Sequence, residues 1–270
     1  MSEKPQPPEK TTGGLTIVPI SVAYASGGKQ WLLPYAFRYF RAHPCETLIE
    51  PFAGSGVVGL SLLHAGIIQR LVLVEKDDRF ACLLHGIVND GTIAERYAAF
   101  ECVLDKIGSL YRTEETAFRY LVQSRVCNRG RFDGGLRNPV HRRWARDMVV
   151  RNIQRVQQMR DRITIICGDA LQWMESYVTD PYVGCYADPP YSADPKSKGR
   201  TIYRYHKLNH KRLFALLAAW RGSWLLTEDN TRTVRRLSLA HRFAFRRVRM
   251  NSAENQWKSE LMIWRKRRIS

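Results

Sequence analysis

Apolar and polar positions alternate along the chain with two different periods, which predict strands and helices in turn. Short apolar runs that end in an acidic residue predict buried strands, as in "TLIE" before Pro51 and "RLVLVE" before Lys76. Apolar residues at helical spacing follow each run, and these helices are expected to end at Gly66 and near Asn89. Alternating strands and helices of this length predict an α/β fold with a mostly parallel, doubly wound sheet.

The same patterns continue towards the end of the chain. A helix is expected over residues 29–42, and later strands in "RITIICGDA", "YVGCYADPPY" and "SWLLTEDN". Two alternating stretches near the end, "HRFAFRRVRM" and "SELMIWRK", predict an antiparallel pair of strands. Residues 1–20 begin as a polar, proline-rich stretch, and we interpret them as a flexible arm.

Candidate ligand-binding residues fall where the predicted strands end, which is where sheets of this kind bind ligands. Gly54 and Gly56 would let the backbone approach a ligand at a helix N-terminus. Glu75 ends the next strand, where nucleotide-binding folds place an acid for ribose hydroxyls, or it caps a helix. Asp169 ends a third strand and could reach an adenine ring or cap the helix that follows. Three such features in order favour a nucleoside site.

The spacing of these residues excludes the commoner nucleotide motifs. "GSG" lacks the third glycine of the dinucleotide fingerprint, and no GK[ST] of a P-loop occurs. A nucleoside ligand without phosphates fits better, and S-adenosylmethionine is one. The six cysteines form no CxxC pair, and His206 and His210 have no acidic or thiol partner at ligand spacing. We therefore expect neither a metal site nor a disulfide framework.

The excess of positive charge predicts a polyanionic partner. The 43 Lys and Arg exceed the 25 Asp and Glu, which gives a formal charge of +18. Residues 119–160 hold eleven arginines against Asp133 and Asp147, and residues 231–270 hold twelve Lys and Arg against two Glu. Arginine suits phosphates and base edges, so nucleic acid is the favoured partner. No apolar stretch reaches the roughly 20 residues of a membrane span, and we expect a cytosolic protein.

From about Tyr24 to Trp264 the chain resembles the Dam-like, DPPY-class adenine-N6 DNA methyltransferases. The resemblance rests on several motifs in the family's order: "SGGK" at 26–29, "EPFAGSG" at 50–56, "VEKD" at 74–77, "NRGRF" at 128–132, "CGDA" at 167–170, "DPPY" at 188–191 and "SELMIW" at 259–264. It implies a Rossmann-like, S-adenosylmethionine-dependent catalytic core in residues 21–93 and 161–270. It also implies a mainly helical or loop target-recognition insert at 94–160, where the arginines lie.

The resemblance implies a role for each matching position. Lys29 would help hold the methionine part of the cofactor, Glu75 the ribose hydroxyls, and Asp188 both the cofactor and the target amine. The family's usual aromatic position is occupied by Ala25, so Tyr24, one residue earlier, is expected to contact the cofactor instead. The expected cofactor-binding residues are Tyr24, Gly28, Lys29, Phe52, Gly54, Gly56, Glu75, Asp169 and Asp188.

Asp188, Pro189, Pro190 and Tyr191 form the expected catalytic motif. The adenine amine is a poor nucleophile, whereas the sulfonium methyl is already activated, so the enzyme must orient the amine and accept its hydrogens. Asp188 would accept one hydrogen and the Pro189 carbonyl the other. Tyr191 would stack on a base flipped out of the helix, and the two prolines would end the strand and hold these groups rigidly.

Four arginines are the expected contacts to double-stranded DNA: Arg125, Arg129, Arg131 and Arg137. They surround "NRGRFDGG", whose glycines suit a hairpin or tight loop entering a groove, with Phe132 as a wedge or stacking ring. An RNA adenine or N4-cytosine methyltransferase, and a nucleic-acid-binding protein without catalysis, stay open as alternatives. The recognition sequence, the role in restriction-modification, phage modification or regulation, and the oligomeric state, including a monomer, stay open too.

Overall fold

The protein was analysed as a computed structural model, which describes residues 10–12, 15–24, 28–113, 116–191, 204–251 and 257–266. The strands are β1 (Lys10–Thr12), β2 (Leu15–Ile17), β3 (Thr47–Glu50), β4 (Arg70–Glu75), β5 (Ile163–Cys167), β6 (Val183–Ala187), β7 (Trp224–Asp229), β8 (Phe243–Asn251) and β9 (Trp257–Arg265). The α-helices are α1 (Leu33–Ala42), α2 (Val57–His64), α3 (Asp78–Asn89), α4 (Ile93–Ala99), α5 (Leu104–Thr113), α6 (Ala117–Val126), α7 (Arg146–Gln157), α8 (Ala170–Tyr177), α10 (His210–Ala219) and α11 (Arg232–Ala240). Short 3-10 helices are η1 (Gln30–Leu32), η2 (Asn128–Gly130), η3 (Val140–Arg143) and η4 (Arg160–Arg162).

A seven-stranded mixed sheet forms the centre of the molecule, with the strand order β5-β4-β3-β6-β7-β9-β8. The strands from β5 to β7 are parallel, and β9 and β8 continue the sheet in antiparallel pairing. The chain leaves β3 in one direction through β4 and β5 and then returns to β6 on the other side. The topological switch point therefore lies between β3 and β6. The predicted α/β class, doubly wound sheet and terminal antiparallel pair are confirmed.

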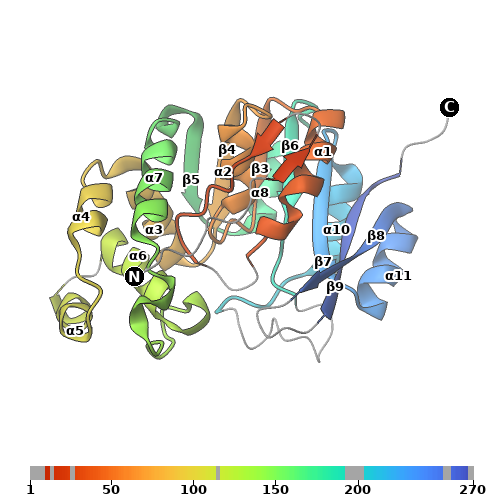
Figure 1. The fold of residues 1–270 in the computed structure, drawn as a ribbon. Coiled ribbons are helices and arrows are strands. Elements are labelled where there is room, and N and C mark those ends of the chain that lie inside the picture. Colours follow the sequence, from red (N-terminus) through yellow and green to blue (C-terminus); the bar gives the residue numbers. More distant parts are fainter. Residues whose placement is uncertain are drawn as a thin grey trace.

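Helices cover both faces of the sheet, because its buried strands carry apolar residues on both sides. In β4, Leu71 and Leu73 face one hydrophobic cluster, whereas Val72 and Val74 face the other. Helices α1, α2, α3, α6 and α7 contribute to the first cluster, and α8, α10 and α11 to the second. Figure 1 shows the sheet between these two layers.

The arginine-rich part of the chain is mainly helical and lies beside the β5 edge of the sheet. Helices α6 and α7 pack against α3, and α4 packs against α7. Figure 1 shows α4 and α5 at the end of the molecule away from α11 and β8. Buried side chains of these helices belong to the same hydrophobic cluster as the first face of the sheet. The predicted insert at 94–160 is thus packed onto the core, and its boundaries stay a prediction.

The N-terminal segment differs from the flexible arm expected over residues 1–20. Strands β1 and β2 form an antiparallel hairpin. Ile17 and Ile20 are buried, and the Ile20 amide donates to Ser61 Oγ at 2.9 Å. Burial of these two side chains fixes the segment to α2, a contact between distant residues that local composition does not indicate. The prediction of a flexible arm is therefore wrong for residues 10–12 and 15–20. Residues 1–9 and 13–14 lie outside the described residues.

Close packing of α3 on α6 yields a stability prediction. A Cβ added at Gly86 would overlap Ala117 Cβ, so Gly86→Ala must push the two helices apart. We expect it to lower the free energy of unfolding by about 1–3 kcal/mol. Gly91→Ala is the control, because its new Cβ would meet nothing within 4 Å, and it should change stability by less than about 1 kcal/mol. Urea denaturation measures both, and equal midpoints would contradict this packing.

Candidate active site

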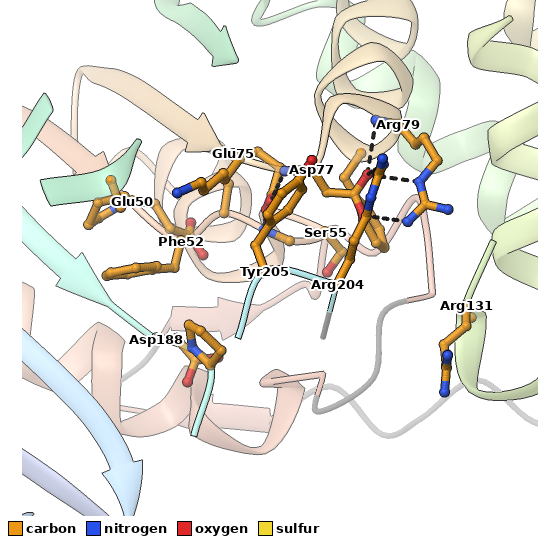
Figure 2. A pocket seen from close by; sticks show the side chains of 18 of the residues that line it. Glu50, Phe52, Ser55, Glu75, Asp77, Arg79, Arg131, Asp188, Arg204 and Tyr205 are labelled. Carbon is orange, nitrogen blue, oxygen red and sulfur yellow. Dashed lines mark hydrogen bonds and ion pairs between the residues drawn. The ribbon is translucent and has the colours of Figure 1, made fainter. Parts of the chain in front are cut away.

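A cavity of about 260 Å³ lies at the carboxyl ends of β3, β4 and β6, beside the topological switch point. Figure 2 shows Phe52, Glu75 and Asp188 around this space. Eight of the residues expected from the sequence line it: Gly28, Lys29, Phe52, Gly54, Glu75, Arg131, Asp188 and Pro190. Residues separated by up to 162 positions in the sequence thus meet in one cavity, as the strand-end pattern predicts.

The glycine turn after β3 is built around the Glu75 carboxylate. Gly54 and Gly56 have φ values of +52° and +65°, a region that favours glycine. Glu75 Oε2 accepts the Gly54 amide at 2.7 Å, and Oε1 accepts the Asp77 amide at 2.8 Å. Burial raises the pKa of Glu75, and these two amides oppose that rise. The expected ligand-facing amide of Gly54 is therefore used by Glu75, which is held rigidly in the cavity wall.

Asp188 follows β6 directly, and one oxygen of its carboxylate is surrounded by three polar groups. Oδ1 lies 2.8 Å from Thr227 Oγ1, 3.0 Å from the Tyr191 hydroxyl and 3.2 Å from Lys29 Nζ. These groups come from β7, from the turn after Asp188 and from the residue before η1. Among the described residues, Oδ2 has no hydrogen-bond partner, and Asp188 lines the cavity. The carboxylate is thus fixed in orientation with one acceptor oxygen left over.

Glu260 of β9 completes this buried cluster. Its Oε2 lies 2.8 Å from the Tyr191 hydroxyl and 3.3 Å from Lys29 Nζ, and only 6% of Glu260 is exposed. Burial raises the pKa of Glu260, while the Lys29 ammonium opposes the rise. Lys29 Nζ also lies 4.6 Å from the centre of the Tyr191 ring. Tyr191 is not part of the cavity wall in this arrangement, which differs from the stacking position expected for it.

Strand β3 contributes a further buried carboxyl, Glu50. Its Oε2 accepts the Gly59 amide at 2.9 Å, and it lines the cavity. Burial raises the pKa of Glu50 well above its ordinary value, and the negative charge of Asp188 adds to this. Pro189 is buried outside the cavity lining, whereas Pro190 lines the cavity.

Asp169 and Tyr24 lie outside the cavity lining. Asp169 Oδ1 accepts the Leu171 amide at 3.0 Å as the N-cap of α8, and Oδ2 pairs with Lys76 Nζ at 2.9 Å. The Tyr24 ring lies under the Arg143 guanidinium, 3.8 Å from its central carbon. The capping alternative for Asp169 is thus the role that the contacts support, and the cofactor role expected for both residues stays a prediction.

Arg125 does not have the nucleic-acid-binding role expected from the sequence, because its side chain is buried. Only 5% of it is exposed, and its Nη2 donates to the Val22 carbonyl at 3.2 Å and to the Ser21 carbonyl at 3.4 Å. It holds the N-terminal segment against α6, because two carbonyls there need a donor. Phe132 is buried as well, 4.6 Å from the Phe80 ring in the cavity wall, so these contacts do not support the wedge expected of it.

The other arginines surround a tight loop closed by the Cys127–Leu136 bridge. Arg131 lines the cavity and pairs with Asp133 at 3.2 Å, and the Arg137 side chain is half-buried away from the cavity. The side chain of Arg129 lies outside the described part of the structure.

Sequence reasoning missed several cavity residues and their partners. Glu260 is an acidic residue inside the apolar "SELMIW" stretch, and Thr227 is a hydroxyl residue at the end of an apolar run. No local motif assigned a role to either side chain. Arg79, Arg204 and Tyr205 also line the cavity and carried no local signal.

Among the described residues, no group of three or more His, Cys, Asp or Glu could hold a metal ion. No helix within them is long and apolar enough to cross a bilayer.

Among the comparisons with known proteins, only the search of solved structures found similar proteins. No protein-family model matches the chain, and no curated protein sequence matches it significantly. An O-methyltransferase from Bacillus cereus in complex with SAH is 12% identical over 90% of this chain and 84% of that chain, with a TM-score of 0.46. An rRNA methyltransferase from Streptomyces viridochromogenes is 11% identical over 94% and 88%, with a TM-score of 0.43. Precorrin-6y C5,15-methyltransferase from Geobacter metallireducens is 10% identical over 90% and 93%, with a TM-score of 0.42. With TM-scores below 0.5, these likenesses carry no argument about the substrate of this chain.

The burial of Arg125 separates its role from that of Arg131. Arg125→Met should lower the free energy of unfolding by about 1–3 kcal/mol, because the Val22 carbonyl loses its donor and the Ser21 carbonyl keeps only Asn152. Its affinity for nucleic acid should stay unchanged. Arg131→Ala breaks a partly exposed pair and should cost less than about 1 kcal/mol of stability. Urea denaturation and fluorescence anisotropy with a labelled DNA duplex test both variants. If the Arg125→Met protein were as stable as wild type but bound DNA more weakly, Arg125 would be a nucleic-acid contact after all.

Proposed function

We propose that this chain transfers a methyl group from S-adenosylmethionine to the N6 amino group of an adenine in double-stranded DNA. The observation that carries the proposal is the Asp188 carboxylate, whose Oδ1 contacts Thr227, Lys29 and the Tyr191 hydroxyl and whose Oδ2 has no partner among the described residues. A hydrogen-bond acceptor fixed in this way at the edge of a cavity suits an exocyclic amine.

The residues around the cavity fit S-adenosylmethionine. Phe52, Phe80 and Phe132 give it apolar walls, which suit an adenine ring. Glu75 is held at the wall by two backbone amides, and the remaining lone pairs of its oxygens suit ribose hydroxyls. The carboxylates near Lys29 suit the positive charge of a sulfonium group. When bound, the cofactor supplies a methyl group that is activated by this charge.

The protein's own part in the reaction is orientation. Asp188 Oδ2 would accept one hydrogen of the target amine, and the Pro189 carbonyl the other, so that the nitrogen lone pair becomes available for the methyl carbon. The nitrogen would take the methyl carbon from sulfur, which would keep the electron pair of the broken bond. The nitrogen would then pass a proton to the Asp188 carboxylate that accepts its hydrogen bond, and from there to water. Tyr191 would have to turn away from Lys29 in order to stack on the adenine.

The charge of +18 supports a nucleic acid as the partner. Arg131 is the expected arginine that lies at the cavity itself, and it neighbours Arg129 across Gly130. We propose that Arg129, Arg131 and Arg137 contact the target, without Arg125. RNA remains the alternative polymer, because phosphates and flipped bases occur in both. The N4 amine of cytosine remains the alternative target atom.

The activity prediction concerns Asp188. Wild-type protein with tritiated S-adenosylmethionine should label an adenine-containing DNA duplex and should leave a duplex of the same sequence made of RNA unlabelled. Asp188→Ala should reduce labelling by more than about tenfold, a loss of over roughly 1.4 kcal/mol in transition-state binding, and Asp188→Asn should retain part of the activity.

Each other outcome of this assay assigns the chain to a different class. Labelling of RNA alone would replace DNA by RNA as the substrate. Labelling of neither polymer, with binding of both, would make the chain a binding protein. An Asp188→Ala protein within about tenfold of wild type would show that the mechanism is wrong.

The cofactor prediction concerns Glu75. Glu75→Gln should weaken the binding of S-adenosylmethionine by about 1.5–3 kcal/mol, because a charged acceptor for the ribose becomes neutral. Glu175→Gln is the control, since this carboxylate is partly exposed and pairs with Arg212 away from the cavity. Calorimetry compares the two variants with wild type. Unchanged affinity in Glu75→Gln would limit Glu75 to holding the glycine turn.

A further inference from the structure

Glu260 brings a second carboxylate to the Lys29 ammonium. It lies in β9 between Asp229 of β7 and Val248 of β8 in the sheet register. Its side chain points to the face of the sheet that carries Lys29, and 4% of Lys29 is exposed. A buried ion pair between one lysine and one carboxylate would leave the cluster neutral, and Asp188 alone would suffice for that. The second carboxylate therefore adds charge that the ion pair does not require.

The cluster carries a net negative charge when both carboxylates are ionised. Lys29 contributes one positive charge, and Asp188 and Glu260 contribute two negative charges. Apart from Lys207, the other cationic groups near the cavity have acidic partners of their own. Among the described residues, these pairs are Arg79 with Asp77, Arg131 with Asp133, Arg204 with Asp78 and Lys76 with Asp169. The excess negative charge thus lies at the strand ends, where Glu50, Glu75 and Asp188 line the cavity.

Methyl transfer changes the charge of the cofactor. The sulfur of S-adenosylmethionine is a positively charged sulfonium, whereas the sulfur of the product, S-adenosylhomocysteine, is a neutral thioether. The two molecules are otherwise alike apart from the methyl group. A fixed negative charge in a partly dry site attracts the first more than the second, and the attraction persists over several ångströms because screening there is weak.

We propose that Glu260 is a positioning residue that makes this site prefer the charged methyl donor over the uncharged product. It does so by offsetting Lys29, which leaves Asp188 as uncompensated negative charge, and by holding Lys29 on the Oδ1 side of Asp188. The inference rests on the proposed function, since it requires a sulfonium cofactor. Release of the product would be favoured by the same charge, because the product lacks the attraction.

The test compares two ligands on two isosteric variants. Glu260→Gln removes the charge while keeping the shape, and calorimetry measures its affinity for S-adenosylmethionine and for S-adenosylhomocysteine. We expect the affinity for the donor to fall about tenfold more than the affinity for the product. Glu228→Gln is the matched control: Glu228 is a fully buried carboxyl of β7, 3.1 Å from His210 Nε2, and it does not line the cavity. It should leave the ratio of the two affinities unchanged.

A second variant keeps the proposal testable if Glu260→Gln does not fold. Glu260→Asp retains the charge, so it should keep the wild-type ratio of the two affinities even where both fall. Equal losses for donor and product in Glu260→Gln, or a changed ratio in Glu260→Asp, would give Glu260 a merely structural role and overturn the inference alone. Wild-type protein that binds neither ligand would overturn the proposed function together with the inference.

Discussion

The buried ammonium of Lys29 is the interaction on which the candidate site depends. It joins a residue near the start of the chain to Asp188 at the end of β6 and to Glu260 near the end of the chain. A buried lysine is costly to desolvate unless it is paired, so the three segments are held together by this requirement. The same contacts fix the orientation of the Asp188 carboxylate. Stability and the geometry of the acceptor oxygen thus have one cause.

The segment that leads to Lys29 is itself held by buried polar contacts. Asn152 Nδ2 donates to the Ser21 carbonyl at 3.1 Å, and Arg125 donates to the carbonyls of Ser21 and Val22. These donors come from α7 and α6 of the arginine-rich region, so that region supports the cavity end of the sheet as well as carrying charge. A change in α6 would consequently reach the site through the position of Lys29. This connection gives the buried arginine a function that its sequence neighbourhood does not suggest.

Local patterns were sufficient to predict the sheet and, at the cavity, Gly54 and Glu75. The expected roles of Lys29 and Asp188 came from the resemblance to the DPPY-class methyltransferases. Acidic residues at the ends of apolar runs predicted where β3 and β4 end, and the cavity lies there because parallel strands end at one edge. Arg125 was misplaced because burial of a charged side chain depends on carbonyls more than 100 residues away. Glu260 was not assigned a role for the same reason, since its partner Lys29 is 231 positions distant. Contacts of this kind follow from the fold and leave no local periodicity.

The central claim is that a fixed carboxylate at the end of β6 directs methyl transfer to an exocyclic adenine amine in DNA. Mass spectrometry of nucleosides measures the product directly, with DNA and RNA digested separately from cells that express the wild-type chain or Asp188→Ala. The account predicts N6-methyladenine in the DNA of cells with the wild-type chain and its loss with Asp188→Ala. N4-methylcytosine in that DNA, or a methylated nucleoside confined to RNA, would contradict it.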